Sequence, residues 1–391
     1  MRVLFIATPG IGHVYPMVPL AWAFRTAGHE VLIGTSGLGL PVTSAGLDVA
    51  NIAPQFEPPA FWQPVMIKLS REHPELAPQM AAMRSGKVED QRFVAPFLAK
   101  LSGFLADGAM KVAEDWKPDL VVQSRSQGAG LVVAGKLGVP LVDHGIGLSR
   151  TPELHDIFHQ HMTDVFERHG VTGLPETRLG LDLAPASMID GEHEGWPMRF
   201  VPYNGGVVLP EWLNFRPERP RIAVTLGTVS TLEGTGMSTL ERVIRAAEKV
   251  DAEFVLALGE TDLSALGTLP ENVRVAGWLP LAALLPSCAA MIHHGGGSTT
   301  LTTLAAGVPQ LIVPDGADRH INAAAVGRRG AGLVTEPDAF DAALVAEVLS
   351  DERFRTAAAE VHAEIRAMPS PTDLVRRLTD QVAGRRSATA G

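Results

Sequence analysis

Two parts of the chain begin with the same pattern, a short run of apolar residues that is followed by a glycine-containing loop. The first run covers residues 3–8 and is followed by Gly10 and Gly12, and the second covers residues 221–226 and is followed by Gly227. Apolar runs of this kind are typical of strands in parallel sheets that are buried on both faces. The pattern therefore predicts two parallel sheets, each with a glycine loop after its first strand.

Helical segments alternate with further apolar runs in both halves of the chain. After the first loop, Pro16 suits the first position of a helix that ends at Gly28. Further strands are expected at residues 30–35, 119–122, 139–142, 254–257, 273–276, 290–292 and 310–313, and further helices at 128–137, 239–249, 298–306, 320–328 and 339–349. This alternation predicts an α/β protein with two doubly wound domains that face each other across a cleft.

Glycine and proline are frequent between Tyr203 and Pro220, which is typical of an interdomain linker. The last segment begins with Ser370 and Pro371, which suit the start of a helix. We therefore expect an N-terminal domain, a linker, a C-terminal domain and a final helix, over residues 1–203, 204–217, 218–368 and 369–391, respectively.

The composition limits the classes of protein to which the chain can belong. With 33 basic and 43 acidic residues among 391, the net charge is −10, and no run of Lys and Arg offers a surface for nucleic acid. Cys288 is the only cysteine, which excludes intramolecular disulfides and cysteine-based zinc sites and suits a reducing compartment. No segment approaches the ~20 apolar residues that span a membrane, and the first apolar run ends too early for a secretory signal. We expect a cytoplasmic protein without a membrane or nucleic-acid partner.

The strongest chemical signal is the segment 292–300, which follows an expected strand and precedes an expected helix. Its candidate anion-binding residues are His293, Gly295, Gly297, Ser298 and Thr299. Glycine lets the backbone approach an anion closely, and the first N–H groups of a helix attract negative charge. The segment predicts a site for a diphosphate held without a metal, and a flexible glycine turn is the alternative. A zinc site formed by His293 and His294 is disfavoured, because adjacent side chains diverge.

Other phosphate-binding motifs do not occur in the sequence. A P-loop requires a lysine after its glycines, and none follows here. A dinucleotide-binding fold holds the ribose with an acidic residue at the end of its second strand, and the run at residues 30–35 does not end in one. The Asp-x-Asp motif of metal-dependent sugar transfer and the Gly-x-Ser-x-Gly elbow of lipases are also absent. We therefore expect no metal cofactor.

Aromatic residues and methionines are concentrated between residues 52 and 97. Such a region can line an adaptable pocket for a hydrophobic ligand, and ordinary loop packing is the alternative. The candidate pocket residues from this region are Phe61, Trp62, Met66, Met83 and Phe93.

His155 and His159 have the i, i+4 spacing of zinc ligands, but Asp156 stands where a zinc protease has Glu. Leu154 and Phe158 recur at helical spacing. The segment is therefore interpreted as an amphipathic helix at the border of the pocket. Phe158 and His144 complete the set of candidate pocket residues.

Several motifs fall in the order and spacing of a known family. They are Gly227-Thr228, Gly277-Trp278-Leu279-Pro280, the segment 293–299, Gly307-Val308-Pro309 and Asp318, together with the segment 12–16 near the N-terminus. In these motifs the chain resembles GT-B glycosyltransferases, and among them the actinobacterial antibiotic and macrolide glycosyltransferases, which are relatives of plant UDP-sugar transferases. The resemblance covers nearly the whole chain and is most specific between Gly277 and Asn322.

The resemblance implies a GT-B fold, with two Rossmann-like domains facing across a cleft and the last helix packed back on the first domain. It also implies an inverting, metal-independent transfer of a deoxysugar from a dTDP-sugar to a small hydrophobic natural product in antibiotic biosynthesis. The first domain would hold the acceptor and the second the nucleotide sugar. UDP in place of dTDP and a homodimer are open alternatives. The rival functions are a sugar-nucleotide epimerase or hydrolase of the same architecture, and a non-catalytic protein that binds a nucleotide or a natural product.

Residues of the second domain that match the family's motifs are expected to contact the nucleotide-sugar donor. By this resemblance Trp278 flanks the nucleobase and Leu279 contacts its edge. The diphosphate and the sugar would be held by Thr228, His293, Gly297, Ser298 and Asp318. Arg319 stands beside the donor where the family often has Gln.

His13 is the expected catalytic base. It stands at the carboxyl end of the first strand, where open α/β sheets bind ligands, and the start of a helix near Tyr15 disfavours a charged imidazole. A neutral ring can remove the proton of an acceptor hydroxyl, and a histidine that caps the loop is the alternative.

The family often orients this base with an Asp at the end of the strand that follows Lys-Pro-Asp, where this chain has Ser124. A hydroxyl cannot stabilise an imidazolium as a carboxylate does. The departure implies either an acidic acceptor, such as a phenol, or another carboxylate, with Asp143 as a candidate.

Overall fold

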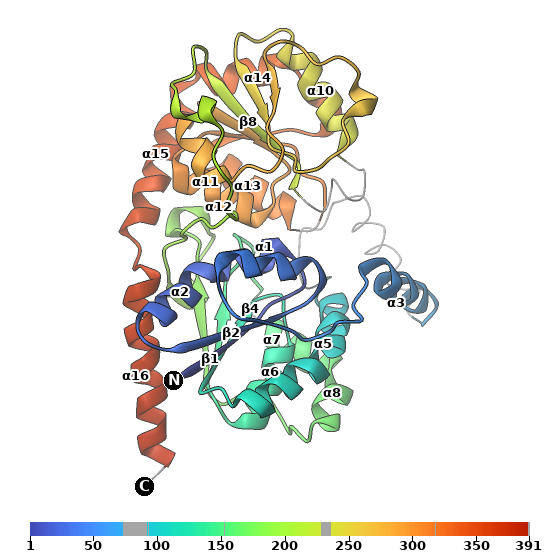
Figure 1. Ribbon diagram of the computed structural model, residues 1–391, viewed down its shortest axis with the longest axis vertical. Coiled ribbons are helices and arrows are strands. Elements are labelled where there is room, and N and C mark those ends of the chain that lie inside the picture. The colour runs from blue at the N-terminus through green and yellow to red at the C-terminus, as the bar shows by residue number, and fades with distance from the viewer. Residues whose placement is uncertain (73–91, 93, 152, 228–235, 317, 390–391) are drawn as a thin grey trace.

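The computed structural model describes residues 1–72, 92, 94–151, 153–227, 236–316 and 318–389. These residues form two α/β halves arranged along the longest axis of the molecule, each built on its own parallel sheet (Figure 1). The predicted fold of two doubly wound α/β units is confirmed.

In the described part of the chain, the first sheet has seven strands in the order β3-β2-β1-β4-β5-β6-β7. Their bounds are β1 Arg2–Ile6, β2 Glu30–Thr35, β3 Val49–Asn51, β4 Leu120–Ser124, β5 Leu141–His144, β6 Arg178–Asp182 and β7 Trp196–Pro197. Because β1 pairs in parallel with both β2 and β4, the strand order reverses between β1 and β4. Ligands of open parallel sheets bind at the carboxyl ends of the strands at such a point.

Helices cover both faces of the first sheet. The β1 side chains Val3 and Phe5 share a core cluster with α2 (Val18–Thr26), and Leu4 and Ile6 share another with the helices of the opposite face. This alternation follows from the two-residue period of a strand. Further helical segments of this half are α1 Ile11–Val14, η1 Tyr15–Met17, η2 Gly37–Ala45, α3 Pro58–Glu72, α5 Ala95–Trp116, α6 Ala129–Leu137, α7 Leu154–His161, α8 Thr163–Arg168 and η5 Ala186–Met188. The next segment, η6 Glu211–Asn214, packs against the core of the second half through Trp212 and Leu213.

The second sheet has the order β10-β9-β8-β11-β12-β13, again with parallel pairing. Its strands are β8 Arg221–Thr225, β9 Glu253–Leu256, β10 Val273–Val275, β11 Ala290–His293, β12 Gln310–Ile312 and β13 Gly332–Val334. The helical segments are α10 Met237–Ala247, η7 Ser264–Leu266, α11 Leu281–Leu284, η8 Leu285–Ser287, α12 Gly297–Ala306, α13 Arg319–Arg329, η9 Pro337–Ala339, α14 Ala342–Ser350, α15 Glu352–Ala367 and α16 Pro371–Thr389. The strand order reverses between β8 and β11, so the segment after β11 lies at the second switch point.

The last two helices connect the halves. α15 packs against α12 of the second half, whereas α16 runs along the first half and packs against α2 (Figure 1). Leu374 and Leu378 of α16 are buried in the same core cluster as Leu20 of α2. The chain also joins the halves through the segment before β8, and the two connections lie side by side, because Arg199 N–H donates a hydrogen bond to the carbonyl of Pro369 (2.8 Å).

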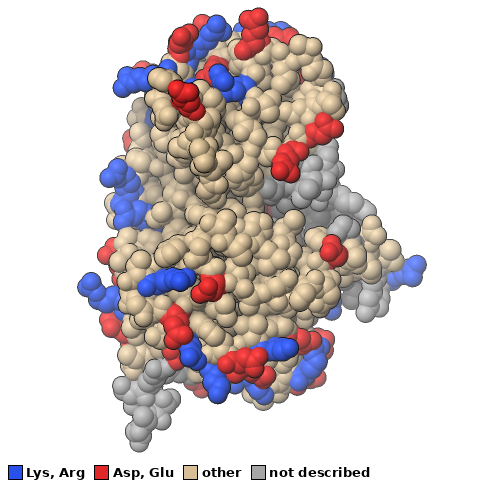
Figure 2. Space-filling view, viewed as in Figure 1, with Lys and Arg blue, Asp and Glu red and all other residues tan. Residues whose placement is uncertain are grey.

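Charged side chains are unevenly distributed over the face shown in Figure 2. They lie mainly at the two ends and along the edges, and the middle region where the halves meet carries few of them. Within the described ranges, no helix combines the length and the apolar character that crossing a membrane requires.

Candidate active site

His13 lies in the first helical turn after β1. The helix begins at Ile11, earlier than predicted, because Gly10 in an extended conformation leads the chain directly into α1. The imidazole is partly exposed, and its Nδ1 lies 3.0 Å from Oγ of Ser126. Nε2 is therefore the ring nitrogen that remains for a substrate.

The partner of His13 is a cluster of hydroxyl groups. Ser126 Oγ lies 3.1 Å from Thr8 Oγ1 and 3.3 Å from Ser124 Oγ. The prediction that Ser124 occupies the partner position is corrected here, because the hydroxyl on the imidazole belongs to Ser126 and Ser124 lies one hydroxyl further away. The reason is a turn after β4, closed by the hydrogen bond from Gln127 N–H to Ser124 O (2.8 Å), which returns Ser126 toward β1.

Burial lowers the pKa of His13 below its ordinary value, and the carboxylate of Asp318 acts in the opposite direction. The imidazole is therefore neutral at neutral pH, which is the state that a general base needs. Asp318 belongs to the second half of the molecule. Its carboxylate therefore acts on His13 across the boundary between the two halves.

Replacing Ser126 with Ala is expected to lower kcat about fivefold to tenfold and to leave KM nearly unchanged, because a neutral hydrogen bond contributes ~1 kcal/mol. Steady-state kinetics measures the change. Ser124→Ala is the matched control, since it removes a hydroxyl from the same cluster without removing the contact with His13. Equal losses in the two variants would argue against Ser126 as the partner of the ring.

Asp143 was the alternative carboxylate for His13, and the structure places it elsewhere. Its Oδ1 accepts a hydrogen bond from Gln123 Nε2 (2.6 Å), and its second oxygen contacts His155. Gln123 and Asp143 point to the face of the sheet opposite to Ser124, because neighbouring strand residues alternate. The alternative of an Asp143–His13 pair is therefore wrong.

The candidate pocket residues do not form one group. Phe61 packs against Trp62 and Phe104, with ring centroids 4.9 and 5.1 Å apart, and their role in acceptor binding stays a prediction. Phe158 is 0% exposed inside the core between α5 and α7, so its helical spacing reflects the core and the predicted acceptor contact is wrong. Met83 and Phe93, like the side chain of Met66, lie outside the described residues.

His144 is fully buried at the end of β5. Its Nδ1 lies 2.7 Å from the carbonyl of Gly145 and must donate to it, which leaves Nε2 as an acceptor without a hydrogen-bond partner among the described residues. Burial lowers the pKa of His144 to about 4. The ring is therefore a neutral acceptor of hydrogen bonds, and its role toward an acceptor molecule stays a prediction.

The glycine turn after β11 is fixed by a hydrogen bond to the buried side chain of His293. His293 Nδ1 accepts a hydrogen bond from Gly295 N–H (3.0 Å), so Nε2 carries the proton and donates it to Gln310 Oε1 (2.7 Å). Burial lowers the pKa of His293 to about 4. Both nitrogens are engaged inside the protein, and the prediction that His293 contacts the diphosphate is therefore corrected to a supporting role.

His294 is the histidine that lies between the two glycine loops of the second half. A β-carbon on Gly227 or on Gly296 would lie 2.5 or 2.6 Å from its ring, so only glycine fits on either side. Burial, with smaller effects of Arg319 and His293, lowers the pKa of His294 well below its ordinary value. Sequence reasoning missed this residue, although the alternation of strand side chains separates it from His293.

The turn itself has the geometry of an anion site. Gly295 has φ +85°, and α12 begins at Gly297, so the first N–H groups of the helix, including those of Ser298 and Thr299, have no partner within the helix. Asp318 Oδ2 accepts a hydrogen bond from Asn322 Nδ2 (2.9 Å). Arg319 donates a hydrogen bond to the carbonyl of Asp315 (2.7 Å) and also contacts the Asp315 carboxylate. The guanidinium is therefore paired with a residue of the second half.

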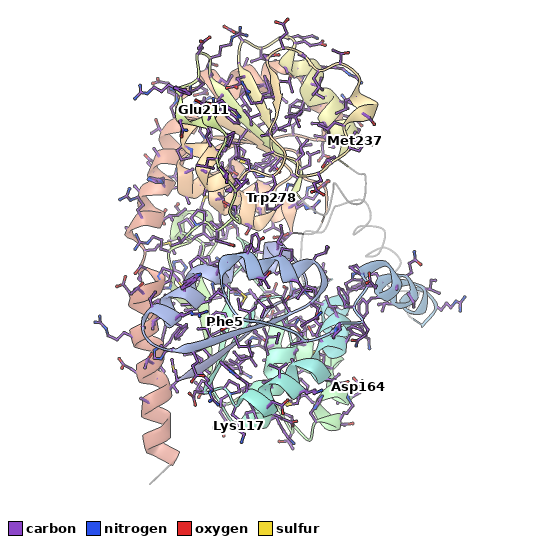
Figure 3. The ribbon with its side chains drawn as sticks, in the orientation of Figure 1. Phe5, Lys117, Asp164, Glu211, Met237 and Trp278 are labelled. Atoms are coloured by element: carbon purple, nitrogen blue, oxygen red, sulfur yellow. The ribbon has the colours of Figure 1, made fainter. Side chains whose placement is uncertain are left out.

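Trp278 lies on the side of the second half that faces the first (Figure 3). The indole is 42% exposed, whereas the neighbouring Leu279 is buried. A β-carbon on Gly205 would lie 3.3 Å from Trp278 Nε1, so the ring borders the connecting segment. An exposed flat ring at the boundary of the two halves suits a nucleobase, while Thr228 lies outside the described residues.

Two Rossmann-like halves that bring a neutral histidine and a glycine turn to one cleft have the organisation of GT-B glycosyltransferases. Comparison with known proteins gives the family. Residues 22–227 match the N-terminal domain and residues 241–381 the C-terminal domain of the family described as erythromycin biosynthesis protein CIII-like. The chain belongs to this family and is a glycosyltransferase.

Individual relatives agree over the whole length. The elloramycin glycosyltransferase ElmGT of Streptomyces olivaceus is 44% identical over 384 residues, which cover 97% of each chain. The crystal structure of the glycosyltransferase SnogD from Streptomyces nogalater is similar with a TM-score of 0.82 and 38% identity, covering 98% of this chain and 99% of that one. The spinosyn rhamnosyltransferase SpnG, in complex with thymidine diphosphate, has a TM-score of 0.81 and 32% identity, covering 97% of this chain and 100% of that one. The predicted GT-B fold and glycosyltransferase class are confirmed.

Proposed function

We propose that this glycosyltransferase moves a deoxysugar from a dTDP-sugar to the hydroxyl of a small hydrophobic natural product, with inversion and without a metal. The observation that carries the proposal is the close approach of the two halves at the glycine turn, where a β-carbon on Gly147 of the first half would lie 3.3 Å from Cα of Gly297 and 3.4 Å from Asp318 Oδ2. The carboxylate of Asp318 also acts electrostatically on the neutral imidazole of His13. The thymidine diphosphate bound by SpnG supports the donor class, and the names of the elloramycin glycosyltransferase ElmGT and the spinosyn rhamnosyltransferase SpnG support a natural product as acceptor.

The second half, over residues 218–368, takes the donor in this proposal. The N-terminal N–H groups of α12 and the positive end of its dipole receive the diphosphate. Trp278 stacks on thymine, and the free oxygen of Asp318 accepts hydrogen bonds from sugar hydroxyls. The charge that develops on the leaving diphosphate is then stabilised by groups that are already in place.

The first half, over residues 1–203, takes the acceptor. Nε2 of His13 accepts the proton of the acceptor hydroxyl while that oxygen attacks the anomeric carbon, and the bond to the diphosphate oxygen breaks. This is a single displacement, in which the acceptor oxygen attacks from the side opposite to the leaving diphosphate and no covalent sugar–enzyme intermediate forms. The configuration at this carbon is therefore inverted.

The test is turnover of a panel of dTDP-deoxysugars with polyketide aglycones in the presence of EDTA. A glycoside of inverted anomeric configuration, identified by NMR, is the expected product. Release of dTDP or a changed sugar in the absence of any aglycone would instead support a hydrolase or an epimerase. No binding of dTDP by calorimetry would contradict the donor assignment.

Replacing Trp278 with Ala is expected to weaken dTDP binding about tenfold, because stacking of a base on an aromatic ring contributes ~1–3 kcal/mol. Calorimetric titration with dTDP measures the change. Trp22→Ala is the control, since Trp22 is also an exposed indole (38%) but lies on α2 of the first half. An unchanged dissociation constant in the Trp278 variant would remove this residue from the nucleobase site.

A further inference from the structure

The loop after β5, residues 145–150, contacts the glycine turn of the other half. A β-carbon on Gly297 would lie 2.8 Å from the carbonyl oxygen of Ile146 and 3.0 Å from Cα of Gly147. The two backbones are therefore in direct contact, with no room for a side chain between them. One of these segments belongs to the acceptor half and the other to the donor half.

Asn322 of α13 joins the same two segments by hydrogen bonds. Its Oδ1 accepts from Leu148 N–H (3.1 Å), and its Nδ2 donates to the carbonyl of Gly295 (2.9 Å) and to Asp318 Oδ2 (2.9 Å). The side chain is 0% exposed. The oxygen of the Asn322 side-chain amide faces a backbone N–H and its nitrogen faces a backbone carbonyl, so the orientation of the amide is determined. A carboxylate at this position would lack the N–H donor.

The loop is also fixed to its own half. Arg150 donates to the carbonyl of Ser149 (2.8 Å) and pairs with Asp182 at the end of β6 (2.5 Å). Asp182 accepts a further hydrogen bond from Ala184 N–H (3.1 Å). A loop held in this way can transmit a shift of the glycine turn to the end of the first sheet.

We propose that Asn322 is a positioning residue that couples the diphosphate turn to the acceptor half and holds Asp318 in the orientation used for the sugar. The proposal rests on the proposed donor site. A ligand that stabilises the turn stabilises, through Asn322, the loop 145–150 in the other half. Such coupling is reciprocal, so an acceptor that contacts the loop strengthens donor binding by the same factor.

The experiment is amide hydrogen exchange of the full chain with and without dTDP. In the wild type, dTDP is expected to slow exchange in residues 295–300 and also in residues 145–150, the latter by about fivefold or more, the lower end of typical coupling. In Asn322→Ala the protection of 145–150 is expected to disappear while 295–300 remain protected. Asn322→Ser, which keeps a small polar group in the buried position, is the second variant and should behave in the same way.

Asn272→Ala is the matched control. Asn272 also lies in the second half and donates to backbone carbonyls, those of Ala247 and Ala252 (both 2.9 Å), but it does not bridge the halves. It should lower thermal stability and keep the dTDP effect on residues 145–150.

Protection of 145–150 that survives in both Asn322 variants, or that is missing from the wild type while 295–300 are protected, would overturn the coupling and leave the proposed function intact. Absence of protection at 295–300 in the wild type would overturn the donor site and the coupling with it.

Discussion

Replacing His13 with Ala is expected to lower kcat by ~10²–10⁴, the usual contribution of a general base. The acceptor hydroxyl must lose its proton as it attacks, and His13 is the neutral side chain at the switch point of the first sheet. The affinity for dTDP should stay within about twofold of the wild type, because the nucleotide contacts lie in the other half. Single-turnover kinetics with saturating dTDP-sugar measures the loss, and calorimetry measures the affinity.

His169→Ala is the control for the loss of a histidine. His169 contacts Asp107 (2.8 Å) on the exposed side of the first half, away from the cleft, and its replacement should leave kcat unchanged. Full activity of the His13 variant would end the assignment of the base. A loss of dTDP affinity as large as the loss of rate would instead indicate a structural role.

The pH dependence of the wild type tests the same residue. Burial lowers the pKa of His13, so the base stays neutral above pH 6.5 and for some distance below it. The rate kcat/KM is expected to be flat in this range and to fall only at lower pH, where the ring gains a proton. The residual activity of His13→Ala should lack this acidic limb. A wild-type limb centred above pH 6.5 would contradict a lowered pKa.

Replacing Gly297 with Ala is expected to lower kcat/KM by about 10²-fold. The added β-carbon would meet the backbone of Ile146 and Gly147 at 2.8 and 3.0 Å, so the turn and the loop must separate. The donor then moves away from His13, and a misplacement of ~1 Å costs on the order of 10²-fold in rate. The loss is measured with both substrates varied, and dTDP affinity is measured separately.

Gly384→Ala gives the matched comparison. Gly384 also lies in a helix, and apart from the backbone of that helix no described atom lies within 4 Å of the position of its β-carbon. Alanine is favoured over glycine in helices by roughly 0.5–1 kcal/mol, so this variant should keep its activity and its stability. Activity of the Gly297 variant equal to that of the Gly384 variant would show that the two backbones can separate without cost.

The fold could be predicted from the sequence because each sheet begins with an uninterrupted apolar strand and a glycine loop. The glycine turn could be placed for the same reason, since it follows a strand and precedes a helix. Strands with little apolar signal, such as β7 with the two residues Trp196–Pro197, did not stand out. Phe158 shows a further limit, because apolar residues of a pocket and of a core have the same helical spacing.

The partners within the site required the structure. His293 and His294 are equivalent in the sequence, and only the pairing of β11 with β12 places Gln310 against one of them. Ser126 reaches His13 through a turn whose closing hydrogen bond joins backbone atoms. Asn322 acts between segments far apart in the chain, so no local pattern indicates its role.

The side-by-side connections at Arg199 and Pro369 restrict how the molecule can move. Two chain segments connect the halves at one edge of the molecule, so the halves can slide or twist little at that edge. The remaining motion is a hinge rotation about a line through the edge. Substrates would then enter and leave on the opposite side, where the separation grows most for a given angle. A small change in backbone dihedrals near residues 200 and 369 is sufficient for such an opening.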